Sequence, residues 1–148
     1  MPIDTILIAD DSASVRRVLA EMLTPVGYTI TFAADGAEAL RMVQASPPHL
    51  ILMDIRMPKM DGYEVCQRLK QDPATTGIPV LMVTGMDETD DIRQALQHGA
   101  DGYIMKPFHM EQLRATIHEM LQRATSGTLP GRFFRKSPPA SSQSEPSP

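Results

Sequence analysis

The sequence has few of the residues that mark disulfide-stabilised or membrane-spanning proteins. Tryptophan is absent. Cys66 is the only cysteine, so an intrachain disulfide is impossible. A lone cysteine most often packs as a small hydrophobe, and we interpret Cys66 in this way. No apolar run approaches the length that crosses a bilayer, and no basic segment followed by an apolar run opens the chain. We therefore expect a cytoplasmic protein with no membrane partner.

Positive charge is also scarce. The chain has 14 Lys and Arg against 18 Asp and Glu, which gives a formal net charge of −4. A nucleic-acid-binding surface needs clustered cations to neutralise phosphates, so we expect no nucleic-acid partner. Hydrophobic residues make up 42% and charged residues 22% of the 148 residues, which is ordinary for a folded protein of one domain.

The apolar segments alternate between short β-rich runs and longer segments with helical spacing. This alternation is typical of a parallel sheet covered by helices, and the short runs are continuously apolar, as in strands buried on both faces. We predict an α/β fold with a doubly wound, five-stranded parallel sheet in a three-layer sandwich. The predicted strands are Ile3–Ala9, Tyr28–Ala33, Leu50–Met53, Pro79–Val83 and Gly102–Met105.

Five helices are predicted from apolar residues that recur at helical spacing. Asp35 followed by Glu38 matches a capping box, Asp61 is a candidate N-cap, and Gly99 suits a C-cap with positive φ. Because Asp61 has this structural role, we leave it out of any functional site. The helices are predicted from Val15 to Leu23, from Asp35 through Val43, from near Asp61 through Leu69, from Asp87 to Gly99, and after Pro107 through Leu121.

The composition changes from Thr125 onward, where Pro, Ser and Gly dominate and the apolar periodicity ends. We expect a folded domain over residues 1–124 and a disordered tail over residues 125–148. Within that tail, the basic segment Arg132–Lys136 could dock on a partner or an anionic surface, although a short solvated stretch is the simpler interpretation.

Polar residues follow four of the five predicted strands. Asp10 and Asp11 follow the first, Asp54 the third, Thr84 the fourth and Lys106 the fifth. With the strand order 2-1-3-4-5, the first and third strands are neighbours, so the three carboxylates meet at one rim. Three close acids cannot all stay ionised without a cation, and Mg²⁺ prefers oxygen ligands and bridges carboxylates to phosphate. An Asp nucleophile could then form an acyl phosphate, with the lysine and the threonine binding its oxygens.

Each of these residues also has a simpler interpretation when taken alone. Asp10 and Asp11 could cap a helix, and Asp54 could be a turn residue. Thr84 could be a β-branched strand end, and Lys106 an exposed loop lysine. Agreement of four strand ends with the needs of one phosphoryl site favours the functional interpretation. The four histidines show no spacing typical of a metal cluster.

These residues match a known pattern, because the chain resembles the receiver domains of bacterial two-component response regulators from Ile6 to about Leu121. The resemblance implies a flavodoxin-like fold and a single-domain regulator similar to those of chemotaxis. It rests on Asp10-Asp11, Asp54 with Met57-Pro58 and Asp61-Gly62, Thr84-Gly85, Tyr103, and Lys106-Pro107-Phe108.

The resemblance implies a role for each site residue. Asp54 is the expected phosphoacceptor, and the expected Mg²⁺ ligands are Asp10, Asp11, Asp54 and the backbone carbonyl of Arg56. Lys106 is expected to pair with the phosphoryl group, next to a cis Lys106–Pro107 bond. Thr84 and Tyr103 are the expected switch, although Tyr103 could instead be a core-facing strand residue.

The implied phosphodonor is a phosphohistidine on a histidine kinase or a histidine phosphotransfer protein, docking near the first helix and the loop after the last strand. The downstream target protein is unknown. We expect the protein to catalyse only its own phosphorylation and dephosphorylation, and therefore not to be an enzyme. An aspartyl-phosphate phosphatase is one rival, but Arg56 stands where such enzymes carry a second Asp. A receiver-like module that is never phosphorylated is another, but such modules typically lack some of these residues.

Overall fold

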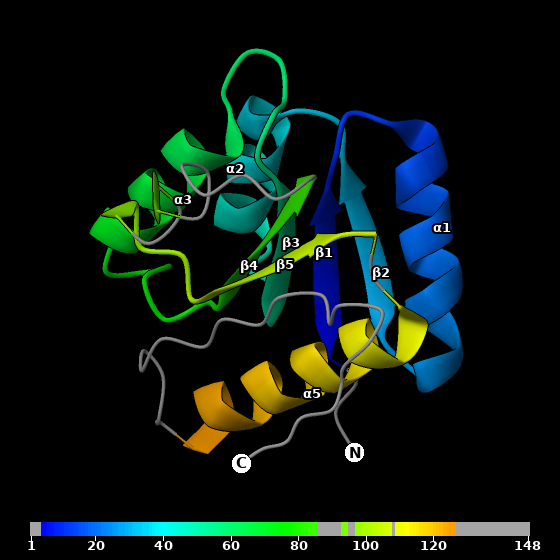
Figure 1. Ribbon diagram of the computed structural model, residues 1–148. Helices are drawn as coiled ribbons and strands as arrows, with labels where there is room; N and C mark the ends of the chain where they lie inside the picture. Colours follow the sequence, from blue (N-terminus) through cyan, green and yellow to red (C-terminus); the bar gives the residue numbers. More distant parts are fainter. Residues whose placement is uncertain (1–3, 86–92, 95–96, 108, 127–148) are drawn as a thin grey trace.

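The strands form one five-stranded parallel sheet in the order β2-β1-β3-β4-β5 (Figure 1). The computed structural model describes residues 4–85, 93–94, 97–107 and 109–126, without the side chains of residues 84, 85, 125 and 126. The predicted fold class and strand order are confirmed. The strands are β1 (Thr5–Ala9), β2 (Thr29–Ala33), β3 (Leu50–Asp54), β4 (Val80–Gly85) and β5 (Gly102–Lys106).

Helices cover both faces of the sheet, with α1 and α5 on one face and α2 and α3 on the other (Figure 1). Most of the predicted fourth helix, Asp87–Gly99, lies outside the described residues, but Gly99 has the expected positive φ, +94°. The last helix continues past Ala124, where we expected the folded part to end. The helices are α1 (Ala13–Leu23), the 3₁₀ turn η1 (Thr24–Val26), α2 (Gly36–Ala45), α3 (Gly62–Gln71) and α5 (Met110–Ser126).

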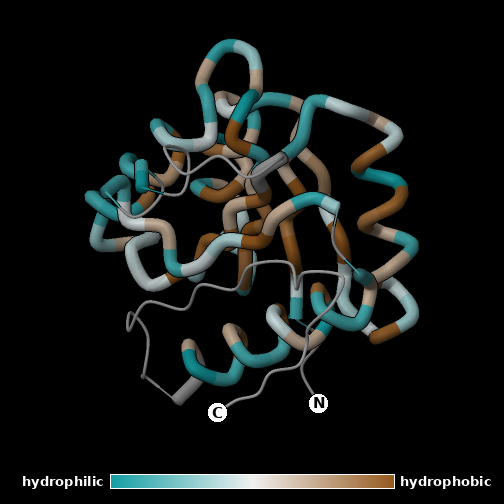
Figure 2. Tube along the Cα trace, in the orientation of Figure 1, coloured by the Kyte–Doolittle hydropathy of each residue, from teal (hydrophilic) through white to brown (hydrophobic). Residues whose placement is uncertain are grey.

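The sheet separates two apolar cores, because successive residues of a strand point to opposite faces. On β3, Ile51 packs in the core under α2 and α3, whereas Leu52 packs in the core under α1 and α5. The apolar strands run through the centre of the molecule in Figure 2. Each buried Leu or Ile side chain contributes about 1.5–3 kcal/mol to stability, so the two cores hold the strand ends in fixed positions.

The predicted helix caps are confirmed at two helices that flank the sheet. Asp35 accepts a hydrogen bond from the Glu38 amide at 2.8 Å, and Asp61 accepts one from the Glu64 amide at 3.0 Å. The Glu38 carboxylate accepts from the Ala34 amide at 2.8 Å, one residue earlier than in a standard capping box. Both caps fix the start of a helix beside the carboxyl ends of the strands.

Two further predictions concern Cys66 and the tail. Cys66 is fully buried on α3, as predicted for a small hydrophobe. Residues 127–148, which include Arg132–Lys136, lie outside the described residues. Among the helices that the structure does describe, none combines the length and the apolar character needed to span a bilayer.

Candidate functional site

Three carboxylates gather at the carboxyl ends of β1 and β3. The two strands pair in parallel with Ala9 opposite Met53, so Asp10 and Asp54 follow at equivalent positions on neighbouring strands. One carboxylate oxygen each from Asp10, Asp11 and Asp54 lies within 4.8 Å of the others. We call these three residues the acidic cluster.

Asp10 is held by the turn that leads into α1. It is 3% exposed, and its Oδ1 accepts a hydrogen bond from the Ser12 amide at 2.9 Å. Ser12 is the N-cap of α1 and accepts from the Val15 amide at 3.3 Å. The capping alternative for the acidic pair is therefore only partly correct, because Asp10 orders the turn while Ser12 caps the helix.

Lys106 faces the acidic cluster from the end of β5. Its Nζ lies 3.9 Å from Asp10 Oδ2, and its side chain is 34% exposed. The Lys106–Pro107 peptide bond is cis, as the resemblance implied. At this distance the ammonium group forms a loose ion pair and retains freedom to move toward another anion.

The cluster has more negative charge than its surroundings compensate. Burial and the nearby Asp10 carboxylate raise the pKa of Asp54 to about 6, although Lys106 acts in the opposite direction. Burial also raises the pKa of Asp10, against the Ser12 amide and Lys106. Carboxylates forced together in this way gain stability from a cation.

The donor set fits a hard divalent cation. All three groups offer carboxylate oxygens, and Mg²⁺ binds oxygen ligands at 2.0–2.1 Å, so opposite ligands of one ion are about 4.2 Å apart. The oxygens here lie within 4.8 Å of one another, which requires only small side-chain adjustments. The acidic cluster could therefore hold a metal ion.

The other predicted site residues are placed less completely. The backbone of Thr84 lies beside Met105 where β4 pairs with β5, but its side chain is outside the part that the structure describes. Tyr103 is 6% exposed and packs in the core under α2 and α3. This position matches the core-facing alternative for Tyr103, and its role in a switch stays a prediction. Arg56 follows β3 with an exposed side chain.

Arg16 is a neighbour of the site that the sequence did not reveal. Its guanidinium donates a hydrogen bond from Nη1 to the Asp10 carbonyl oxygen at 2.6 Å, which ties α1 to the end of β1. The sequence contains Arg16 and Arg17 side by side. Nothing in that pattern distinguishes the one that reaches the site, because only the direction of α1 decides it.

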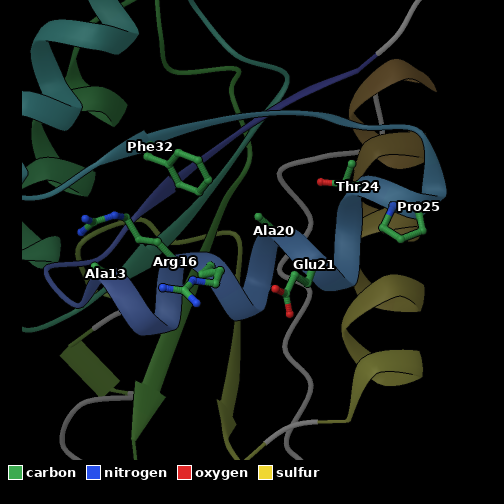
Figure 3. A pocket seen from close by; sticks show the side chains of 8 residues that line it. Ala13, Arg16, Ala20, Glu21, Thr24, Pro25 and Phe32 are labelled. Carbon is green, nitrogen blue, oxygen red and sulfur yellow. The ribbon is translucent and has the colours of Figure 1, made fainter.

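Two grooves lie on opposite faces of α1. One, of about 630 Å³, runs between α1 and the edge strand β2, and Arg16, Ala20 and Phe32 contribute to its lining (Figure 3). The other, of about 390 Å³, is lined by Val18, Lys106 and other residues of α1 and the loop after β5. Each groove includes a residue that contacts Asp10 of the acidic cluster: Arg16 lines the first and Lys106 the second.

A protein-family model described as the response regulator receiver domain matches residues 6–118. The chain belongs to the response regulator receiver family. Among solved structures, this receiver is similar to a response regulator from Chloroflexus aurantiacus, with 33% identity, a TM-score of 0.80 and coverage of 82% of this chain and 100% of the other. A CheY-like receiver domain protein from Methanospirillum hungatei is 30% identical, with a TM-score of 0.79 and coverage of 85% of this chain and 99% of the other.

Curated relatives have names that point to transcription. The probable transcriptional regulator ycf27 of Cyanophora paradoxa is 42% identical over 84% of this receiver and 51% of its own length. The DNA-binding dual master transcriptional regulator RpaA of Synechocystis is 38% identical over 80% of this receiver and 49% of its own length. This receiver spans about half the length of these relatives. Their names conflict with our expectation of no nucleic-acid partner.

Proposed function

We propose that this receiver accepts a phosphoryl group on Asp54 from a phosphohistidine, with Mg²⁺ held by Asp10, Asp11, Asp54 and the Arg56 backbone carbonyl. The observation that carries the proposal is the acidic cluster with Lys106 Nζ 3.9 Å from Asp10 Oδ2. This arrangement brings a nucleophile, a metal-binding set and a cation to one rim. Phosphoryl transfer requires little more than such positioning and charge stabilisation.

Asp54 is the nucleophile in this proposal. One of its oxygens attacks phosphorus while the P–N bond of the phosphohistidine breaks and its electron pair returns to the imidazole, which then takes a proton from solvent. The pKa of Asp54, raised to about 6, leaves the carboxylate mostly ionised at neutral pH and able to attack. When bound, Mg²⁺ supplies positive charge for the phosphoryl oxygens and the nearby carboxylates.

Lys106 stabilises the transferred group. Its loose contact with Asp10 lets the ammonium move to a phosphoryl oxygen once that oxygen arrives near Asp54. The acyl phosphate ends when water attacks phosphorus and the bond to the Asp54 oxygen breaks, which restores the carboxylate and releases phosphate. The receiver therefore catalyses only reactions of its own aspartate and is not an enzyme for external substrates.

The switch involves Thr84 and Tyr103. Thr84 is drawn toward the phosphoryl group, and Tyr103 occupies the inward position on β5, where it is 6% exposed. The face around β5 and α5 then changes its affinity for a partner. The names of the relatives support transcriptional control as the output, exerted in the cytoplasm through a DNA-binding partner region and not through the acidic receiver itself.

The donor docks on the groove between α1 and the loop after β5. This groove has an apolar wall that includes Val18, 47% exposed, and it reaches Lys106. A histidine kinase or phosphotransfer protein seated there would bring its phosphohistidine to the rim that holds Asp54.

The direct test is incubation with acetyl phosphate and Mg²⁺, followed by intact mass measurement. We expect the unmodified protein to gain one phosphoryl group and Asp54→Ala to gain none. Asp61→Asn is a matched control, because an amide oxygen can still accept from the Glu64 amide at the N-cap of α3. If the unmodified protein gains no phosphoryl group, the proposal is wrong.

The donor interaction is tested separately with two matched variants. Val18→Glu places a charge in the groove beside Lys106, whereas Phe32→Glu places one in the groove on the other face of α1. We expect Val18→Glu alone to slow transfer from a phosphohistidine donor, with both variants still accepting from acetyl phosphate. Equal effects of the two variants would contradict the docking site.

A further inference from the structure

The loop between β3 and α3, residues 55–61, is packed against the first turn of α2. A Cβ atom on Gly36 would overlap the backbone carbonyl of Met60, so the loop approaches the helix as closely as a glycine allows. Glycine is a poor choice in a helix by propensity. Its presence directly after the N-cap Asp35 is explained by this close approach.

An ion pair fastens the same loop. Lys59 Nζ lies 3.5 Å from Asp35 Oδ2, with the Asp35 side chain only 16% exposed. Lys59 has φ of +71°, a left-handed conformation that a non-glycine residue seldom adopts. Asp35 therefore has two tasks, because one oxygen caps α2 at the Glu38 amide while the other faces Lys59.

The opposite end of the loop is fixed to the site strand. The Gly62 amide donates to the Ile55 carbonyl at 2.7 Å, and a Cβ on Gly62 would overlap the carbonyl oxygen of Asp54. Arg56, whose carbonyl is a proposed metal ligand, lies between these two attachments. The loop is thus anchored on both sides of the group that must point at the metal.

We propose that Gly36 and the Asp35–Lys59 ion pair act as positioning residues for the β3–α3 loop and thereby set the Mg²⁺ affinity of the acidic cluster. This inference rests on the proposed Mg²⁺ site. A loop that is ordered before the metal arrives has less conformational entropy to lose on binding. Releasing the loop from α2 therefore weakens metal binding without removing any ligand.

Two substitutions remove the ion pair while keeping the other tasks of each residue. Lys59→Asn removes the cation but keeps a residue type that readily adopts positive φ. Asp35→Asn removes the anion but keeps an oxygen that can accept from the Glu38 amide. The Lys59 side chain is 70% exposed and solvent weakens such an ion pair, so each variant is expected to raise the Mg²⁺ dissociation constant by only about two- to fivefold.

The dissociation constant is measured by titrating Mg²⁺ and following amide chemical shifts, which requires no phosphorylation. The double variant should bind Mg²⁺ no more weakly than either single variant, because both remove the same contact. In the metal-free protein, Lys59→Asn should speed hydrogen exchange of the Gly62 amide. Gly36→Ala should weaken Mg²⁺ binding more than Lys59→Asn or Asp35→Asn does. If Gly36→Ala fails to fold, the two ion-pair variants by themselves test the positioning role.

Arg68→Ala is the matched control. It removes the exposed Glu64–Arg68 pair on α3, at 2.8 Å, without touching the loop, and it should leave the Mg²⁺ dissociation constant unchanged. An unchanged dissociation constant in both Lys59→Asn and Asp35→Asn would overturn the positioning role alone, provided that the unmodified protein binds Mg²⁺. If the unmodified protein shows no Mg²⁺-induced shifts, the metal site itself is wrong.

Discussion

The two ends of the sheet each carry a buried aspartate beside a lysine, but the two pairs differ in how completely they are compensated. Asp10 and Asp101 are each 3% exposed. At the amino end of β4 and β5, Lys70 Nζ lies 2.6 Å from Asp101 Oδ2, and it also donates to the Ile78 carbonyl at 2.7 Å. Asp101 Oδ2 accepts a further bond from the Val80 amide at 2.9 Å.

The carboxyl end of the sheet has the same residue types, but there the negative charge of the aspartates is less completely compensated by cations. Lys106 approaches Asp10 only to 3.9 Å, and Arg16, a second cation that acts on Asp10, donates to its backbone carbonyl oxygen. A buried charge with close partners is satisfied and serves the fold, whereas an under-compensated cluster shifts its pKa values and is available for a ligand. By this criterion Lys70 and Asp101 form a structural ion pair, whereas the acidic cluster is a candidate functional site.

The largest expected effect is on phosphorylation. Asp10→Ala should reduce Mg²⁺-dependent phosphorylation by acetyl phosphate by about a hundredfold or more, since loss of even a supporting residue of a metal site costs about 10–100-fold. Asp101→Asn should leave the rate unchanged. Intact mass at a series of times measures both. A rate loss in Asp101→Asn equal to that in Asp10→Ala would remove the distinction between the two ends.

The second effect is on stability. Asp101→Asn keeps an acceptor for the Val80 amide but leaves the largely buried Lys70 cation without its anion, and we expect a loss of about 3 kcal/mol in the free energy of unfolding. Urea unfolding measures this. Adding Lys70→Met should recover part of the loss. Additive losses in the double variant would contradict a direct pair.

The third effect depends on pH. The pKa of Asp54 is raised to about 6, so folding favours the protonated form of this side chain. The resulting contribution to the free energy of unfolding is fully present below the unfolded pKa near 4 and is lost as pH rises through 6. Asp54→Asn cannot ionise, so in metal-free buffer it should be more stable than the unmodified protein at pH 7.5 by about 1–2 kcal/mol. The two should be nearly equal at pH 4. Mg²⁺ should reduce the difference at pH 7.5, and a difference that grows with Mg²⁺ would contradict this explanation.

The smallest effect is expected at the surface of α3. Arg68→Ala removes an ion pair whose side chains are about half exposed, and such pairs contribute about 0.5 kcal/mol or less. Its urea midpoint should therefore move far less than that of Asp101→Asn. A comparable shift would show that closeness of two charges, and not their burial, determines the stability of this protein.

The sequence predicted the sheet well because its strands are continuously apolar and end in distinctive residues. The periodic apolar segments located α1, α2, α3 and α5, and local signals located the caps at Asp35 and Asp61. Strand boundaries shifted by a residue or two, as at β4, which begins at Val80 where we predicted Pro79. Proline lacks the amide that a strand position normally uses.

The partners of the buried charges were not predictable in the same way. Arg16 and Arg17 are equivalent in the sequence, yet only Arg16 is shown to donate to the Asp10 carbonyl. The pairing of Lys70 with Asp101 and of Lys59 with Asp35 joins residues from separate elements. Such contacts depend on helix direction and loop path, which local patterns do not encode.

The sequence by itself therefore determined which residues stand at the strand ends, because strand length and hydrophobic pattern are local properties. Tertiary structure decided how those residues share their charge. It set Lys106 at 3.9 Å and Lys70 at 2.6 Å from their aspartates, and it buried Asp54 near the Asp10 carboxylate, which together raise the pKa of Asp54. The physical reason is that electrostatic energy depends on distance and burial, which only the packing of the whole sheet fixes.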